Sequence, residues 1–168
     1  AEGAEAFVTV SRSRKAKVRN GVLEDLTASK RGGLGLRVLR EGRTGIATTT
    51  DLSRASFSDL VQQAWELAAL GDPDPWLRQA EPSGSDDLPS RYDARAEALA
   101  PEDRIQRAFR LEAAARKASD RVVAVREAAW SDGAGASLLL TQRGVRTADL
   151  GSSCSASIEL AVEREGDR

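Results

Sequence analysis

The sequence contains no histidine and no methionine, and only one cysteine among its 168 residues. The lack of histidine excludes the commonest general base, the commonest zinc ligand and every nucleophile that a histidine activates. A single cysteine, Cys154, can form neither an intrachain disulfide nor a cysteine metal cluster. We expect Cys154 to be a buried structural thiol. Such sparing use of cysteine suits a reducing compartment, and we expect the protein to be cytoplasmic.

Long apolar runs are also missing. None approaches the roughly 18–20 residues that a membrane span needs, and no signal-peptide pattern is present. Aromatic residues make up only 4% of the chain, so leucine, valine and alanine must build most of the core. The length is that of one domain. We therefore predict a single α+β domain over residues 1–168 and no membrane contact. The sequence begins at Ala1 without methionine, so either its start has been processed or it is a piece of a longer protein, and we expect the second.

Turn-forming residues interrupt the first fifty positions about every ten residues. Asn20-Gly21 can supply the two positive φ angles of a type I′ hairpin turn. Arg31-Gly32-Gly33 and Glu41-Gly42 are expected to break the chain again. Between the breaks, apolar residues alternate with others, which is the period of a strand. We predict an antiparallel meander of strands over residues 6–13, 15–19, 22–28, 33–40 and 44–50, preceded by the tail of a helix over 1–5.

Two later stretches have the period of a helix. The first runs over residues 54–70, with Asp51 or Ser53 as its N-cap and Gly71 at its C′ position. The second begins at Pro101, where a missing N–H has no cost, and ends near Asp120. The proline-rich residues 72–98 between them are predicted to form an irregular excursion. Four of its apolar residues are expected to pin it to the fold: Trp76, Leu77, Leu88 and Tyr92.

The rest of the chain returns to the period of strands. We predict strands over residues 122–130, 136–141 and 145–162, with turns at Asp132-Gly133 and Arg143-Gly144. Strands that are grouped, rather than alternating one for one with helices, favour an α+β fold. The prediction is a mostly antiparallel sheet with two helices covering one face.

A run of five basic residues is the first candidate for function, and it comprises Arg12, Arg14, Lys15, Lys17 and Arg19. Such a run can bind nucleic-acid phosphates. However, no aromatic residues for base stacking lie nearby, and the net charge of the chain is −1. We therefore interpret the run as a solvated face or as protection of a strand edge, and do not expect nucleic-acid binding.

Other candidate sites are weaker. The glycines of 31–35 lack the Lys-Ser/Thr of a phosphate-binding loop and are better explained by a turn and a bulge. The paired acids Glu24-Asp25 and Asp86-Asp87 would point to opposite faces of a strand, which does not favour a metal site. Ser11 and Ser13 could pair with Lys15 as nucleophile and base, although surface positions explain them better. We predict no catalytic, cofactor-binding or metal-ligating residue in this chain.

Four segments, in order along the chain, resemble the N-terminal domain of the TldD/PmbA proteins. They are VSRSRKAKVRNGVLED, GGLGLRVLREGRTGIATTTDLS, LAALGDPDP and SSCSASIELAVEREGD. These proteins are also described as modulators of DNA gyrase and as peptidases that act on unfolded peptides. The resemblance covers essentially the whole chain but only the front of the family's length. The sequence pattern TTTDLS…DPDP looks closer to the PmbA (TldE) branch than to the TldD branch.

The resemblance implies a role in proteolysis by a metallopeptidase complex. In the TldD branch, zinc is held by a His-Glu-x-x-x-His motif in the C-terminal part, and none of those ligands maps onto this sequence. The PmbA branch looks like a partner subunit without the metal. The resemblance therefore implies a noncatalytic domain, whose partners are a TldD-like subunit or a second copy and an extended peptide substrate. The alternative is a binding module that uses its basic strand face for nucleic acid or an acidic protein.

Overall fold

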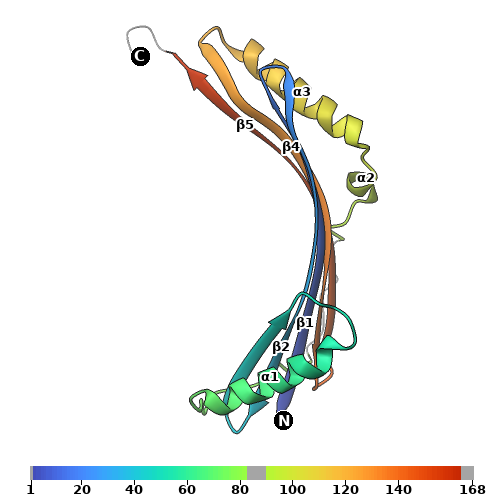
Figure 1. Cartoon of the computed structure of the whole chain (residues 1–168), viewed down its shortest axis with the longest axis vertical. Coiled ribbons are helices and arrows are strands. Elements are labelled where there is room, and N and C mark those ends of the chain that lie inside the picture. Colours follow the sequence, from blue (N-terminus) through green and yellow to red (C-terminus); the bar gives the residue numbers. More distant parts are fainter. Residues whose placement is uncertain (1, 83–89, 164–168) are drawn as a thin grey trace. The chain divides into compact units, whose positions relative to one another are not determined.

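The computed structural model describes residues 2–82 and 90–163 of the chain. The predicted α+β fold is confirmed. One five-stranded sheet has the order β3-β2-β1-β4-β5, and helices accompany it (Figure 1). The elements in chain order are β1 (Gly3–Arg19), β2 (Val22–Arg40), β3 (Arg43–Thr49), α1 (Ser56–Leu70), α2 (Ala94–Glu97), α3 (Pro101–Ala118), β4 (Val122–Thr141) and β5 (Arg146–Val162).

The chain divides into two compact units. Unit 1 comprises residues 1–11, 31–90 and 135–150, and unit 2 comprises residues 12–30, 91–134 and 151–168. The long strands β1, β2, β4 and β5 each contribute residues to both units. The single domain over residues 1–168 stays a prediction, and each unit is described below by itself.

Three of the predicted turns are confirmed. Asn20 and Gly21 have φ angles of 51° and 70°, and Glu41 and Gly42 have 52° and 71°. Both pairs thus provide the two successive positive φ angles of a type I′ hairpin turn. The turn at Arg143-Gly144 also forms, since the Gly144 N–H donates to the Thr141 carbonyl at 3.1 Å.

Two other predicted breaks are wrong, because the chain continues through them as strand. Arg31-Gly32-Gly33 lies inside β2, and Asp132-Gly133 lies inside β4. Gly133 is needed for close approach rather than for a turn, because a Cβ there would lie 2.8 Å from the Arg12 carbonyl oxygen. The helix tail predicted over residues 1–5 is also wrong. Its described part belongs mostly to β1, and the Glu2 N–H donates to the Leu39 carbonyl at 2.8 Å.

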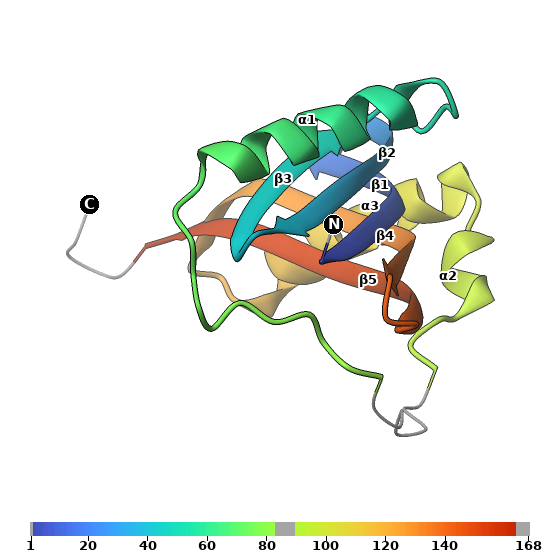
Figure 2. The ribbon, with the colours of Figure 1, turned by 90° about the horizontal axis from the view of Figure 1, so that it is seen from below.

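In unit 1, helix α1 packs on β3 and lies along it in Figure 2. The helix was predicted from its apolar period, and it buries Leu60, Ala64 and Ala68. It comes so close to the strand that a Cβ on Gly45 would lie 1.9 Å from the Ala64 carbonyl oxygen. The buried core consists of Leu34, Val38, Ala47, Leu60 and Ala64.

The ends of α1 differ from the prediction. The N-cap is Ala55, which makes no capping hydrogen bond with its side chain. The Asp51 carboxylate instead accepts from the Ser53 N–H at 2.8 Å, and this local turn keeps both residues off the helix end. At the other end Gly71 is extended, with φ of −76° and ψ of 163°, and is not left-handed. The chain leaves the helix in a direction that requires no positive φ.

In unit 2, helix α3 packs on β1 and β4. The buried residues Ala16, Val18 and Ala108 form the centre of this core, and Ile105, Phe109 and Trp130 pack around them. Pro101 is at the start of α3 as predicted. The short helix α2 was not predicted. It begins after Asp93, whose carboxylate accepts from the Arg95 N–H at 2.9 Å.

In its described part, the excursion after α1 is held by contacts other than those predicted. The prediction that Trp76 pins it is wrong, because this side chain is 81% exposed. The backbone is fixed instead, since the Asp74 N–H donates to the Gly42 carbonyl at 2.7 Å. Gln79 is buried and donates to the Ala4 carbonyl at 2.7 Å. Tyr92 is held in unit 2 by its hydroxyl, and Leu88 lies outside the described residues.

Candidate functional site

The five basic residues of β1 do not form one basic surface, because alternation along the strand sends them to opposite faces. Arg14 is directed toward Asp132, which α3 also contacts, whereas Lys17 is directed toward Glu24 and Glu127. Each of the five pairs with a carboxylate of unit 2. The shortest distances from nitrogen to oxygen are 3.3 Å for Arg12, 3.7 Å for Arg14, 3.1 Å for Lys15 and Lys17, and 3.4 Å for Arg19.

These positions correct the interpretation of the run as edge protection. The sheet order places β2 and β4 on either side of β1, so β1 is an interior strand. Its cations therefore do not shield a free edge. They pair with acids of β2, β4 and α2.

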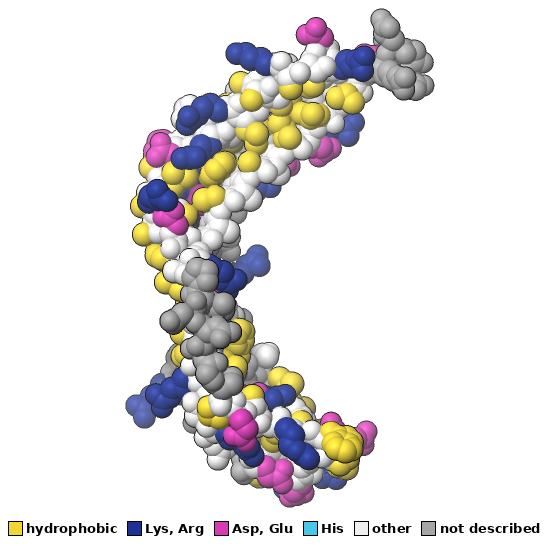
Figure 3. Space-filling view, turned by 180° about the vertical axis from the view of Figure 1, so that it is seen from behind, with side chains coloured by type: hydrophobic (Ala, Val, Ile, Leu, Met, Phe, Trp, Pro, Cys, Tyr) yellow, Lys and Arg dark blue, Asp and Glu magenta, His cyan; other side chains and the backbone are white. Residues whose placement is uncertain are grey.

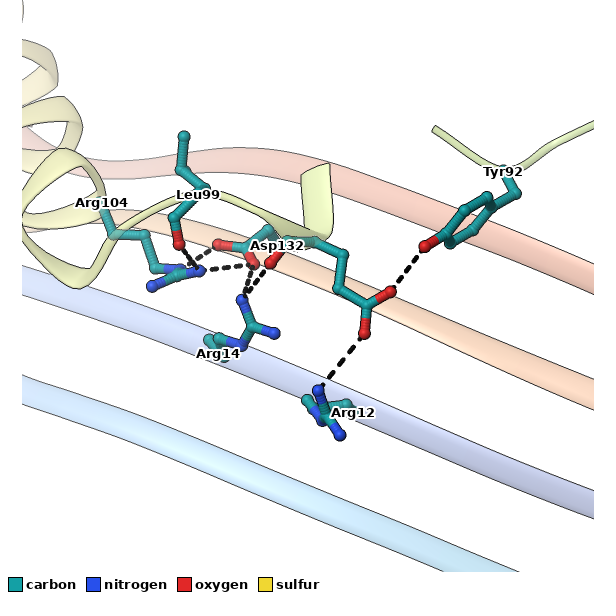
Figure 4. A network of polar contacts seen from close by, with 7 residues as sticks. Arg12, Arg14, Tyr92, Leu99, Arg104 and Asp132 are labelled. Carbon is teal, nitrogen blue, oxygen red and sulfur yellow. Dashed lines mark hydrogen bonds and ion pairs between the residues drawn. The ribbon is translucent and has the colours of Figure 1, made fainter. Parts of the chain in front are cut away.

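The most buried polar group in unit 2 is the ion pair between Arg104 of α3 and Asp132 of β4 (Figure 4). Their side chains are only 3% and 1% exposed. The guanidinium donates to both carboxylate oxygens and to the Leu99 carbonyl. Arg14 adds a second cation, 3.7 Å from Asp132. The buried carboxylate is thus compensated from two sides, as burial of an ion pair requires.

Glu97, the last residue of α2, extends this network toward solvent. Its carboxylate lies 3.3 Å from Arg12 and accepts from the Tyr92 hydroxyl at 2.6 Å. Its backbone carbonyl accepts from Arg14 at 2.8 Å. The hydrogen bond to Glu97, burial and the nearby acidic charges together raise the pKa of Tyr92 above its usual value. Tyr92 therefore acts as a protonated donor that links α2 to the segment that precedes it.

On the other face of β1, lysine and glutamate side chains form a cluster of ion pairs. Lys17 lies 3.1 Å from both Glu24 and Glu127, and Lys15 lies 3.1 Å from Glu127. The hydrogen bonds to Glu24 and then Glu127 raise the pKa of Lys17. Those from Lys15 and then Lys17 lower the pKa of Glu127. Both shifts favour the charged forms of Lys17 and Glu127, so neither of these two is poised to transfer a proton near neutral pH.

Glu112 is a buried acid of α3 that the sequence analysis missed. Its carboxylate accepts from the Gly21 N–H at 2.9 Å and from Arg116 at 2.7 Å. Burial raises the pKa of Glu112, but the hydrogen bonds from Arg116 and Gly21 and the charge of Arg116 outweigh it and lower the pKa. Glu112 thus satisfies the backbone of the β1–β2 turn. Only its i,i+4 spacing from Arg116 was visible in the sequence.

The remaining candidates form no catalytic group. Cys154 is exposed on β5, so the prediction of a buried thiol is wrong. Lys15, offered as a base for Ser11 or Ser13, instead donates to Glu127 at 3.1 Å. The acids of 86–87 lie outside the described residues. Within residues 2–82 and 90–163, no three His, Cys, Asp or Glu side chains gather closely enough to hold a metal ion.

Unit 1 contains an open groove of about 620 Å³ over its first three strands. Gly33 and Gly35 of β2 are among its lining residues, and Gly35 pairs with Thr48 of β3. Its lining residues offer apolar contacts and threonine hydroxyls, and none of them has a titratable side chain that could act as an acid or base. It is lined by Phe7, Thr9, Gly33, Leu34, Gly35, Thr48, Thr49 and Thr50.

None of the helices in the described part of the chain combines the length and apolar character that crossing a membrane requires.

Two family profiles match this chain in succession. PmbA/TldA metallopeptidase domain 1 matches residues 4–68, and the PmbA/TldA metallopeptidase central domain matches residues 95–168. A curated relative, metalloprotease PmbA of Escherichia coli O157:H7, is 26% identical over 170 residues. That alignment covers 99% of this chain and 37% of the relative. The chain thus spans little more than a third of that protein's length.

Solved structures share the fold. TldE of Thermococcus kodakarensis superposes with a TM-score of 0.85 at 18% identity, over 96% of this chain and 36% of that one. A putative modulator of DNA gyrase from Bacteroides thetaiotaomicron gives 0.85 at 23% identity, over 99% and 38%. One from Thermotoga maritima gives 0.74 at 17% identity, over 99% and 41%. With both family profiles matched in order and the fold shared, the chain belongs to the PmbA/TldD family.

Proposed function

We propose that this chain is a noncatalytic part of a PmbA/TldD-type metallopeptidase and takes part in the proteolysis of unfolded peptides within a complex. The observation that carries the proposal is the succession of two metallopeptidase-family domains in a sequence without histidine. A zinc ion with histidine ligands would have to be held by residues outside these 168. The role left to this chain is to shape the complex and contact other subunits and substrate.

The geometry of these sites favours a structural role for the chain over a catalytic one. Three acids of unit 2 could act in proton transfer: Glu97, Glu127 and Asp132. Each forms an ion pair with a basic residue of the same unit. The groove of unit 1 offers contact surface without titratable groups. We further propose that the partners are a TldD-like subunit or a second copy, together with an extended peptide, and that the protein works in the cytoplasm.

The test is a cleavage assay with the purified chain, a labelled unfolded peptide and zinc. We expect no cleavage by the chain alone, and cleavage when a TldD-like subunit that carries a His-Glu-x-x-x-His motif is added. Heat-denatured chain added to the same subunit is the control for a nonspecific effect. Zinc-dependent turnover by the chain alone would overturn the noncatalytic assignment.

The alternative, a binding module with a basic strand face, has less support. Its three arginines, Arg12, Arg14 and Arg19, lie within 3.7 Å of carboxylates of the same unit. Duplex DNA would have to compete with these pairs. Salt-dependent binding to duplex DNA that is lost when the three are neutralised would restore the alternative.

A further inference from the structure

Residues 91–99, which we call the strap, run within unit 2 from β5 to the start of α3. At the β5 end, Arg91 forms a short parallel bridge with Gly151, and the Ser152 N–H donates to the Arg91 carbonyl at 3.0 Å. The Asp93 N–H then donates to the Ser152 hydroxyl at 2.8 Å. The short helix α2 follows at once, and α3 begins at Pro101. The first end of the strap is thus attached to β5 by backbone and hydroxyl hydrogen bonds.

At its other end the strap contacts three arginines that lie on β1 and α3 (Figure 4). The Leu99 carbonyl accepts a hydrogen bond from Arg104, and the Glu97 carbonyl accepts one from Arg14 at 2.8 Å. The Glu97 carboxylate lies 3.3 Å from Arg12. The second end of the strap is therefore attached by charged donors to two carbonyls and one carboxylate.

Polar contacts rather than apolar packing hold the strap. None of residues 91–99 is fully buried, and none belongs to the apolar core of unit 2. The side chains of Arg12 and Glu97 are 50% and 35% exposed, and exposed ion pairs contribute little to stability. Figure 3 shows acidic and basic side chains intermixed along the side of unit 2 that carries α2 and α3. Segments with so few buried apolar contacts open at a lower free energy than the core beside them.

The contacts at the two ends of the strap depend on each other through α2. This helix has only four residues, and a helix that short is not stable by itself in water. Its N-cap, Asp93, is held by the Ser152 hydroxyl, and its last residue, Glu97, is held by Arg12 and Arg14. Release at one end therefore unwinds α2 and withdraws support from the other end.

The buried ion pair beneath the strap is complete without it. Arg104 donates to both carboxylate oxygens of Asp132, and Arg14 lies 3.7 Å from the same carboxylate. An arginine that loses a carbonyl of the strap keeps this carboxylate, and water replaces the carbonyl. Opening of the strap therefore leaves no buried charge without a partner, which is the condition that would make it costly. The pair continues to hold α3 on β4.

We propose that the strap opens and closes as one unit in the folded protein, while β1, β4 and α3 stay in place. Glu97 holds it closed, because its carboxylate and its carbonyl together contact Arg12, Arg14 and Tyr92. Opening frees the Ser152 N–H on β5 and removes the strap from the three arginines. The inference concerns a motion within unit 2 and does not depend on peptide cleavage, so either proposal can fail alone.

Amide hydrogen exchange of the parent protein, followed by NMR, tests the opening. The amides of Asp93, Ala96, Ala98 and Ser152 all lose their acceptors when the strap opens. We expect these four amides to share one degree of protection, and to exchange faster than the amides in the middle of α3. Exchange as slow as that of α3, or no protection of the four at all, would overturn the proposal.

Two variants at the β5 end test whether the strap opens as one unit. Ser152→Ala removes the acceptor of the Asp93 N–H. We expect the amides of Ala96 and Ala98 to exchange faster as well, although neither bonds to Ser152. Ser153→Ala removes the neighbouring hydroxyl and is the matched control, in which exchange of the strap should not change. Faster exchange confined to Asp93 would show that the two ends open separately, and would overturn the proposal.

Glu97→Gln tests the residue that holds the strap closed. It keeps the shape of the side chain but removes the charge that pairs with Arg12. The amides of the strap should exchange about fivefold faster, which is the effect of losing a partly exposed ion pair, while those of α3 keep their protection. Glu102→Gln, which removes an exposed acid of α3 outside the strap, is the control. Equal acceleration in the strap and in α3, or none in either, would contradict the role given to Glu97.

Tyr92 provides a second and independent measurement. It is the only tyrosine in the chain, so the ultraviolet absorbance of tyrosinate reports its ionisation alone. In the closed strap, the hydrogen bond to Glu97 raises the pKa of Tyr92 above the ordinary 10.0. Glu97→Gln is expected to lower this pKa toward 10.0, with circular dichroism showing that the protein stays folded. An unchanged pKa of Tyr92 in the folded variant would overturn the role of the Glu97 carboxylate in closing the strap.

Discussion

The two units attach a helix to the sheet by different means. In unit 1, α1 buries Leu60, Ala64 and Ala68, and its backbone approaches Gly45 where β3 has no side chain. In unit 2, α3 buries Ala108 together with two charged residues, Arg104 and Glu112. One helix is held by close apolar packing, and the other by a small apolar core supplemented with compensated charges.

The difference shows how the charge of α3 can be tolerated inside a protein. A buried ion costs free energy unless its partners are in place. Arg104 has Asp132 and the Leu99 carbonyl, and Glu112 has Arg116 and the Gly21 N–H. Apart from Arg116, which is on α3 itself, these partners come from β4, from the segment before α3 and from the β1–β2 turn. The charges therefore fix where α3 lies relative to three other parts of unit 2, whereas α1 is fixed by shape.

The largest effect is expected from removing one partner of the buried pair. Asp132→Ala would leave the Arg104 guanidinium buried without its carboxylate, and should lower the free energy of unfolding by about 3–5 kcal/mol. Denaturant unfolding followed by circular dichroism measures the loss. The control is the double variant Arg104→Met with Asp132→Leu, which removes both charges and should cost clearly less than Asp132→Ala. A double variant that is less stable than the single one would show that the charges themselves stabilise unit 2.

A smaller loss is expected in unit 1 from filling the space at Gly45. The Cβ of Gly45→Ala would collide with the backbone of α1, at 1.9 Å from the Ala64 carbonyl and 2.3 Å from the Ala68 N–H. Overpacking of this kind costs about 1–3 kcal/mol. The matched control is Gly35→Ala on β2, where the nearest atom would lie at an ordinary 3.8 Å. Hydrogen exchange should show the amides of α1 losing protection in Gly45→Ala only. Equal protection in both variants would refute close packing at Gly45.

The smallest effect, and the one that depends on pH, is expected at Glu112. Its pKa in the folded protein is below the ordinary 4.5, so its ionised form stabilises the fold above that pH. The stabilisation is lost as the pH falls through the lower folded value. Glu112→Gln should cost about 1–2 kcal/mol near neutral pH and less in acid. The measurement is the free energy of unfolding against pH, with Glu102→Gln, an exposed acid of the same helix, as the control. An unchanged pH slope in Glu112→Gln would contradict this role.

Predictions from the sequence succeeded where one local property decides the structure. Asn20-Gly21 and Glu41-Gly42 form turns because few residue pairs supply two positive φ angles. The helices follow from apolar residues at three- and four-residue spacing. Predictions failed at the glycines of 31–33 and at Gly133, because a glycine favours a turn and equally permits a neighbouring strand to approach. Which of the two it does depends on a strand distant in sequence.

Much of the polar network was beyond sequence analysis for a similar reason. Arg104 and Glu112 fall on the buried side of α3, but a charged residue is ordinarily assigned to solvent. Their burial depends on partners as far away as Asp132 and Gly21. The basic residues of β1 were visible as a run, although their partners on β2, β4 and α2 were not. The resemblance to the TldD/PmbA family, in contrast, rests on local segments and was recognisable.

The sequence by itself determined the class of fold, the tight turns, the two long helices and the absence of histidine chemistry, since each depends on residue type and short-range spacing. Only the tertiary structure decided that β1 is an interior strand and that its basic side chains form ion pairs with carboxylates. It also decided that Cys154 is exposed and lies on the edge strand β5. The physical reason is that strand order and the compensation of buried charge depend on contacts between residues far apart in the chain. No local pattern records them.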